Sequence, residues 1–139
     1  MDPAVFTLGI DFGTNSVRAL VVRTSDGAEL GTAVADYPGG HQGVLLDPAD
    51  HNLARQRPAD HLWGLERAVS GALAQARAAE SFDPARLVGI GVDTTGSSPL
   101  PVDAANRALG TLPEWKDDPN AQCWLWKDHT AWQEAQRIT

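Results

Sequence analysis

Five polar side chains lie in the first glycine-containing turn of the chain, between Gly9 and Arg18. They supply a carboxylate, two hydroxyls, an amide and a guanidinium, from Asp11, Thr14, Asn15, Ser16 and Arg18. Such groups bind phosphate oxygens and, through a carboxylate, Mg²⁺. We expect Gly13, which has no Cβ, to adopt a positive φ and to let a ligand approach a nest of backbone N–H groups. The turn therefore predicts a phosphate cradle.

The segments on either side of this turn must hold it in place. Val5–Leu8 precedes it and Ala19–Val22 follows it, and both are apolar and rich in strand-forming residues. They predict a β-hairpin. Asp26-Gly27 predicts a second tight turn, after which residues 29–37 form a third strand paired with the second. An ordinary glycine hairpin with an exposed arginine is the alternative interpretation of this region.

The middle of the chain changes in composition. Residues 38–57 are rich in Gly, Pro, Asp and His, which predicts a long surface loop that either faces a substrate or is a plain insertion. Pro58 and Asp60 favour the start of a helix. Apolar residues then recur at spacings of three and four, which predicts an amphipathic helix near residues 59–79 that covers one face of the sheet.

A second polar loop follows the next apolar run. Residues 87–93 have the pattern of a strand buried on both faces, and we expect this strand to lie parallel in the same sheet. Its two glycines should let another layer pack closely against it. The loop Thr94–Ser98 follows at its carboxyl end, where ligands bind in open α/β sheets. Asp93 ends the strand; it either supports such a site or caps the next turn.

The last third of the chain contains a third polar cluster. Residues 100–109 predict a hairpin in which Asn106 is left-handed, and residues 122–128 resemble a strand. Strand alternation would put Lys127 and Asp128 on opposite faces, so they share a pocket only if the strand ends or bends there. Thr130 with Gln133 predicts a capping box and a terminal helix. We expect Trp124 and Trp126 to pack in the core rather than to stack on a ligand.

Composition narrows the classes of function. The 139 residues, enough for one domain, contain 11 Lys and Arg against 18 Asp and Glu, a net charge of −7. An acidic chain without a basic run is a poor partner for nucleic acid or for an anionic membrane, and no apolar stretch is long enough to span a bilayer. Cys123 is the only cysteine, which excludes an internal disulfide and gives no metal-ligand spacing. We expect a soluble, cytoplasmic protein.

Two groups of motifs carry a resemblance to a known family. Asp11-Phe12-Gly13-Thr14 is similar to the D-x-G-T phosphate motif of the superfamily that joins actin, Hsp70 chaperones and sugar kinases. Gly91–Ser97, followed by the W-K-D-H-T-A stretch Trp126–Ala131, resembles the FGGY carbohydrate kinases, and within them the L-ribulokinase group. The resemblance implies an α/β, RNase-H-like ATPase fold. Residues 1–139 would be the amino-terminal part of the first kinase domain, with the rest of that domain and a second domain lying outside this chain.

The resemblance also implies roles for single residues. ATP and Mg²⁺ would be the cofactors, with the phosphates held by the first hairpin and the metal near Asp11. Four residues would bind the sugar: Thr95, Gly96, Lys127 and Asp128. The glycine at position 96 leaves room that a larger side chain would occupy. In the family the catalytic base is an aspartate of a later segment, which no residue here matches, so we expect this chain alone to have no kinase activity.

The expected function is ATP-dependent phosphorylation of the terminal hydroxyl of ribulose, as in L-arabinose catabolism. The partners would be ATP and a small sugar, and a homodimer of the full-length protein stays open. Another FGGY kinase, acting on xylulose, ribitol or glycerol, is one alternative. A chaperone or actin-like ATPase shares the hairpin but has no use for the Trp126–Thr130 motif. A noncatalytic binding or assembly fragment is the third.

Overall fold

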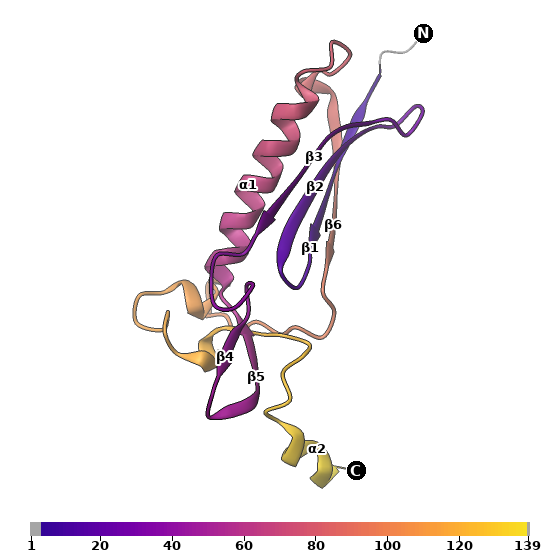
Figure 1. Cartoon of the computed structure of the whole chain (residues 1–139). Coiled ribbons are helices and arrows are strands. Elements are labelled where there is room, and N and C mark those ends of the chain that lie inside the picture. Colours follow the sequence, from indigo (N-terminus) through magenta and orange to yellow (C-terminus); the bar gives the residue numbers. More distant parts are fainter. Residues whose placement is uncertain (1–3, 139) are drawn as a thin grey trace. The chain divides into compact units, whose positions relative to one another are not determined.

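The computed structural model describes residues 4–138, which form two compact units (Figure 1). Unit 1 comprises residues 4–37 and 61–94, and unit 2 comprises residues 38–60 and 95–138. Each unit has its own sheet and its own cluster of buried apolar side chains.

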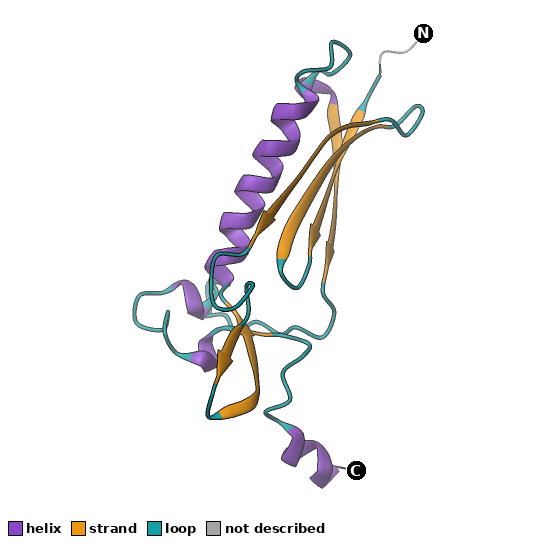
Figure 2. Ribbon diagram, viewed as in Figure 1, coloured by secondary structure: helices purple, strands orange, loops and turns teal. Residues whose placement is uncertain are grey.

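Unit 1 is built on a four-stranded sheet in the order β3-β2-β1-β6 (Figure 2). Its strands are β1 (Phe6–Phe12), β2 (Ser16–Arg23), β3 (Glu29–Asp36) and β6 (Leu87–Thr94). The first three are antiparallel neighbours, and β6 runs parallel to β1. Gly27 in the β2–β3 turn has a φ of 73°. The predicted meander and the predicted parallel strand are therefore confirmed.

Helix α1 (Pro58–Ala76) covers one face of this sheet. Its small residues Ala68, Ala72 and Ala76 are completely buried against the strands. A Cβ on Gly31 of β3 would lie 2.1 Å from the carbonyl oxygen of Ala72, so helix and strand can be this close only because position 31 is glycine. The predicted helix is confirmed, although it ends three residues earlier than expected. Leu62, the first of the apolar residues that recur at spacings of three and four, is 63% exposed and so does not belong to the buried face.

The prediction for β6 is wrong in one respect. Its apolar residues Val88, Ile90 and Val92 are 62–65% exposed, so the strand is not buried on both faces. β6 lies at the edge of the sheet with β1 as its only neighbour among the described strands, and Leu87 is its one residue that packs against the described core cluster. Gly91 meets nothing within 4 Å of a built Cβ, and Gly89 meets only Thr7. The two glycines therefore do not serve close packing of a second layer here.

Unit 2 has a small sheet in the order β4-β5-β7. Strands β4 (Leu45–Asp47) and β5 (Asp50–Gln56) form a hairpin, which corrects the prediction of a long loop over residues 38–57. β7 (Cys123–Trp124) contains only two of the residues expected in the 122–128 strand, because the chain turns after Leu125. Val44, Ala54 and Leu125 form the apolar core of this unit.

Short helices and turns complete the described chain. Their bounds are η1 (Pro84–Arg86), η2 (Leu109–Thr111), η3 (Pro119–Ala121) and α2 (Trp132–Ile138). The predicted 100–109 hairpin is confirmed by a bridge between Val102 and Ala108 and by the left-handed Asn106, with a φ of 58°. The predicted terminal helix is present. The Thr130 hydroxyl, which was expected to cap this helix, instead donates to Asp128. Within residues 4–138 no helix has the length and apolar character needed to cross a membrane.

Candidate functional site

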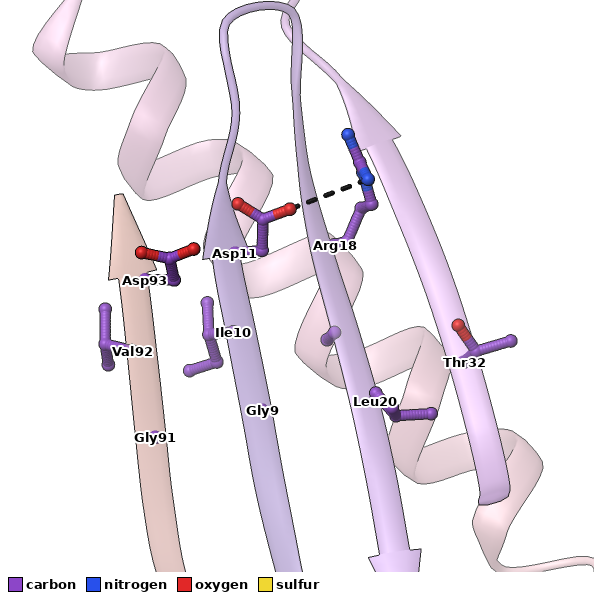
Figure 3. A pocket seen from close by; sticks show the side chains of 10 residues that line it. Gly9, Ile10, Asp11, Arg18, Leu20, Thr32, Gly91, Val92 and Asp93 are labelled. Carbon is purple, nitrogen blue, oxygen red and sulfur yellow. Dashed lines mark ion pairs between the residues drawn. The ribbon is translucent and has the colours of Figure 1, made fainter. Parts of the chain in front are cut away.

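The register of the unit 1 sheet aligns three charged residues. Asp11 of β1 is directly opposite Arg18 of β2 on one side and opposite Asp93 of β6 on the other. All three side chains point to the face of the sheet that α1 does not cover (Figure 3). Arg18 Nη1 lies 3.6 Å from Asp11 Oδ2, and the two side chains are 60% and 41% exposed. An ion pair this exposed adds little stability, so both groups are available to a ligand.

A groove of about 550 Å³ lies next to these charges on the same face. The groove is open at Gly9 and Gly91, which are register partners, because neither residue has a side chain to fill it. Figure 3 shows Asp11, Arg18 and Asp93 at one end of the groove, and Leu20 and Thr32 further along it. The groove is lined by Gly9, Ile10, Asp11, Arg18, Ala19, Leu20, Thr32, Gly91, Val92 and Asp93.

The hairpin tip differs from the prediction in its backbone. Gly13 is not in the left-handed region, and its N–H donates to the carbonyl of Ser16 at 2.9 Å. A Cβ at position 13 would lie 3.3 Å from that carbonyl, so glycine fits the tight turn without a positive φ. Ser16 is buried, Thr14 is half-buried and Asn15 is exposed. These four predicted phosphate ligands sit at the tip and do not line the groove that contains Asp11 and Arg18.

The contacts of Asp93 fit both roles that the sequence left open, a cap for the next turn and support of a binding site. Its Oδ1 accepts a hydrogen bond from the N–H of Thr94 at 3.0 Å, as a turn cap would. Its carboxylate also lies beside that of Asp11 in the groove. No group of three or more metal-ligating side chains occurs among residues 4–138. Two carboxylates on one open face still suit Mg²⁺, which commonly takes one or two carboxylates together with phosphates and water.

The predicted sugar residues Thr95 and Gly96 lie in a turn of unit 2. The hydroxyls of Thr95 and Ser98 are 3.2 Å apart, and Ser98 Oγ lies 3.4 Å from the carbonyl of Gly96. The carbonyl of Ser98 accepts from the Cys123 thiol at 3.6 Å, which ties the turn to β7. A Cβ on Gly96 would meet nothing within 4 Å, so the space expected at this position is present.

A turn separates the other two predicted sugar residues. The N–H of Asp128 donates to the carbonyl of Leu125 at 2.8 Å, so the chain reverses and Lys127 no longer alternates with Asp128 along a strand. Lys127 is exposed, with its ammonium 5.2 Å from the ring centre of Trp126. Trp126 is 51% exposed, so the prediction that it packs in the core is wrong. Trp124 is half-buried.

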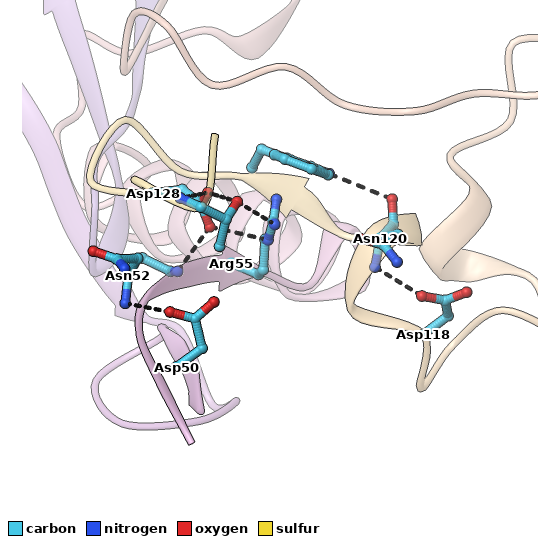
Figure 4. A network of polar contacts seen from close by, with 9 residues as sticks. Asp50, Asn52, Arg55, Asp118, Asn120 and Asp128 are labelled. Carbon is cyan, nitrogen blue, oxygen red and sulfur yellow. Dashed lines mark hydrogen bonds and ion pairs between the residues drawn. The ribbon is translucent and has the colours of Figure 1, made fainter. Parts of the chain in front are cut away.

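The Asp128 carboxylate is buried in a polar network with β5 (Figure 4). Oδ2 accepts from the N–H of Ala54 at 2.9 Å and lies 3.1 Å from Arg55 Nε, and Oδ1 accepts from the N–H and the hydroxyl of Thr130. Burial by itself would raise the pKa of Asp128. The hydrogen bonds from Thr130 and Ala54 and the charge of Arg55 outweigh it and hold this pKa below its usual value.

Arg55 is the site residue that sequence reasoning missed. Its side chain is 2% exposed, and its guanidinium carbon lies 3.2 Å from the ring centre of Trp124. Burial lowers its pKa, opposed by the charge of Asp128. The available signal was the run His51–Arg57, which contains neither Gly nor Pro and so favours a strand inside the supposed loop.

Comparisons with known proteins point to sugar kinases. No family model matches the chain. Curated relatives include a ribulokinase of Vibrio parahaemolyticus, 41% identical over 131 residues, and a ribulokinase of Mycolicibacterium smegmatis, 40% identical over 141 residues. These matches cover 94% and 96% of this chain but 22% and 24% of the relatives. The chain thus spans about a quarter of the length of the ribulokinases it matches.

Solved structures with the same fold are sugar kinases. A xylulose kinase from Brucella ovis has a TM-score of 0.68 at 22% identity, over 96% of this chain and 23% of that one. A glycerol kinase from Plasmodium falciparum, solved with ADP, has a TM-score of 0.69 at 11% identity, over 99% and 23% of the two chains. The chain is therefore similar to ribulokinases along nearly its whole length, and its RNase-H-like fold is that of the corresponding part of these sugar kinases.

Proposed function

We propose that this chain is part of an ATP- and Mg²⁺-dependent sugar kinase of the cytoplasm that phosphorylates the terminal hydroxyl of ribulose, as in L-arabinose catabolism. The observation that carries the proposal is the 41% identity with a ribulokinase over 94% of the chain. The aligned charges of Asp11, Arg18 and Asp93 support it, because a phosphate site needs both a metal-binding carboxylate and a cation.

The residues of unit 1 fit the handling of phosphate. When bound, ATP supplies the phosphoryl group and Mg²⁺ neutralises part of its charge. Asp11 would hold the metal, directly or through water, and Asp93 would support it from the next strand. Arg18 would exchange its loose pairing with Asp11 for a phosphate oxygen. At about 4 Å and an effective dielectric of 20 that attraction is worth roughly 4 kcal/mol before desolvation is subtracted.

The residues of unit 2 fit the recognition of a polyol. Lys127 offers three donors from an exposed turn. The hydroxyl of Thr95 both donates and accepts, and Gly96 leaves open space for the sugar. Polar groups that the wrong sugar leaves unpaired would provide selectivity. No residue of this chain matches the catalytic aspartate of the family, so we expect the pure chain to transfer no phosphate from ATP to a sugar.

A chimera tests the proposal without relying on the isolated chain. This chain would replace the aligned segment of the Vibrio parahaemolyticus ribulokinase, and ATP turnover would be measured with ribulose, xylulose, ribitol and glycerol. We expect turnover to be fastest with ribulose. Asp11→Asn should reduce kcat by roughly a hundredfold or more, the scale of losing an electrostatic group at phosphate. Asp36→Asn, on the exposed end of β3, is the matched control.

The outcomes separate the alternatives. Faster turnover with xylulose, ribitol or glycerol would assign the chain to another kinase of the same fold. ATP turnover that does not depend on any sugar would favour a chaperone-like or actin-like ATPase. A chimera that folds and binds sugar but never turns over ATP would favour a noncatalytic binding role.

A further inference from the structure

We propose that Arg55 is a positioning residue for the sugar-binding turn of unit 2. Arg55, Asp128 and Thr130, together with the N–H of Ala54, form a buried group of contacts that we call the β5 clasp. The clasp fixes the turn that presents Lys127, while Asp128 itself has no contact with the sugar. The statement about Lys127 rests on the function proposed above; the statement about the turn rests on geometry alone.

Contacts within unit 2 occupy most of the acceptor positions of the Asp128 carboxylate. A carboxylate offers about four acceptor positions. Three hydrogen bonds occupy Asp128, from the N–H of Ala54 and from the N–H and hydroxyl of Thr130, and Arg55 Nε lies 3.1 Å away as an ion partner that is not aligned for a hydrogen bond. The side chain is only 5% exposed. One acceptor position is left, next to the Arg55 guanidinium, and the burial of the side chain leaves a sugar hydroxyl little access to it.

Arg55 joins the clasp to both neighbouring elements. Its Nη2 donates to the Thr130 hydroxyl at 3.2 Å, and the face of its guanidinium lies on Trp124 of β7. Its Nη1 is buried and makes no hydrogen bond. Burying an arginine with an unsatisfied nitrogen is costly. An apolar side chain would fill the same space without this cost. We therefore infer that the chain needs a guanidinium at this position.

The clasp and two backbone hydrogen bonds to β5 together hold the turn that carries Lys127. Asp128 and Thr130 flank the turn on one side, and the N–H of His129 donates to the carbonyl of Asn52 at 2.8 Å on the same strand. On the other side the N–H of Leu125 donates to the carbonyl of Ala54 at 3.1 Å. The turn is thus tied to β5 on both sides of Lys127, and its side chain remains exposed. A preorganised donor loses less entropy when a ligand binds.

Proteolysis tests the structural half with this chain alone. Trypsin cuts after Lys127 only when the turn opens locally, so the cutting rate reports the open population when reclosing is fast. We expect Arg55→Met to accelerate cleavage after Lys127 by roughly tenfold or more. Cleavage after the exposed Arg107, in the neighbouring hairpin, should stay unchanged. Arg57→Met, two residues away and exposed, is the matched control and should change neither rate.

Two results would overturn the structural half. One is an unchanged rate after Lys127 in Arg55→Met. The other is equal acceleration after Lys127 and Arg107, which would mean general destabilisation of unit 2. If Arg55→Met does not fold, Thr130→Val serves instead, because it removes the hydroxyl contacts and keeps the ion pair. The rates of cleavage after Lys127 and after Arg107 are then compared in the same way.

Kinetics of the chimera test the link to the sugar. We expect Arg55→Met to raise KM for ribulose by roughly tenfold and to leave KM for ATP unchanged. Lys127→Met should have the same effect, and the double variant should be no worse than Lys127→Met alone, because both changes remove one function. Additive effects in the double variant would overturn the positioning role. If the chimera lacks ribulose-dependent turnover, the proposed function fails. The proteolysis experiment then still shows whether Arg55 holds the turn that carries Lys127.

Discussion

At the scale of single residues, Asp128 is a motif residue whose side chain is fully surrounded by contacts within unit 2. Its side chain accepts three hydrogen bonds and faces Arg55, and these contacts lower its pKa despite burial. A carboxylate with a lowered pKa in the folded state stabilises the fold above its unfolded pKa. That contribution is lost as the pH falls from about 4, the unfolded value, through the folded pKa.

This sign gives a prediction for acid titration. At pH 7 we expect Asp128→Asn to be less stable than the wild type by about 3 to 5 kcal/mol, the scale of breaking a buried ion pair. The difference should shrink as the pH falls below about 4, because the unfolded wild-type chain then gains a proton at Asp128 that the folded carboxylate, with its lower pKa, does not yet bind. Urea unfolding followed by tryptophan fluorescence at a series of pH values measures it. A difference that stays constant down to pH 2.5 would contradict the lowered pKa.

Residue types alone could predict one half of the candidate site. The D-x-G-T turn identified Asp11 and Arg18, because a short local motif and strand pairing suffice to place them on one face. Arg55 could not be assigned in this way, since its partner Asp128 is 73 residues further along the chain. Whether a carboxylate binds a ligand or a buried arginine depends on such distant contacts, which no local pattern contains.

At the scale of elements, strong periodicity was the reliable signal. α1 and the three-stranded meander follow from apolar spacing and from the Asp26-Gly27 turn. The β4–β5 hairpin was predicted as a loop because β4 has only three residues and β5 is mostly polar, and they are strands mainly through pairing with each other and with β7. The predicted strand over residues 122–128 failed because the Leu125–Asp128 turn satisfies the backbone locally.

The contact between α1 and β3 gives the prediction for this scale. Gly31→Ala would place a Cβ 2.1 Å from the Ala72 carbonyl oxygen and 2.7 Å from the Ala76 nitrogen, both of them backbone atoms that cannot rotate away. We expect a loss of about 1 to 3 kcal/mol or more in the free energy of unfolding. Gly91→Ala, also in a strand of this sheet but with nothing within 4 Å, should change stability by less than about 0.5 kcal/mol.

Chemical denaturation of the two alanine variants compares them directly. The wild type and both variants would be unfolded in urea under identical conditions, with circular dichroism of the helix as the signal. Equal stability of Gly31→Ala and Gly91→Ala would mean that α1 can move away from β3 at little cost. The close packing of helix and strand would then not depend on glycine.

At the scale of the whole molecule, the two groups of candidate site residues fall in different units. Asp11, Arg18 and Asp93 belong to unit 1, and the clasp with Lys127 belongs to unit 2. Each unit uses its own sheet to fix its own polar group. Sequence order alone does not suggest this division, because unit 2 is assembled from a middle segment and the last segment of the chain.

The exposed edge of the unit 1 sheet gives the prediction for the whole molecule. Val88, Ile90 and Val92 expose 62–65% of their surface on a strand that pairs on one side only among the described strands. Apolar side chains next to unpaired backbone groups favour association between copies. The net charge of −7 opposes it by repulsion, which salt screens. We therefore expect the 139-residue chain to self-associate with rising concentration, and more strongly at high salt.

Sedimentation velocity over a concentration series at low and high salt measures this association. Ile90→Lys puts a charge on the edge strand, so we expect it to shift the chain toward the monomer at every concentration. Leu62→Lys is the matched control, because Leu62 is equally exposed at 63% but lies on α1. Both variants change the net charge by the same amount, so charge alone cannot separate them. An equal shift in the two variants would attribute the association to net charge, and would contradict a role for the β6 edge.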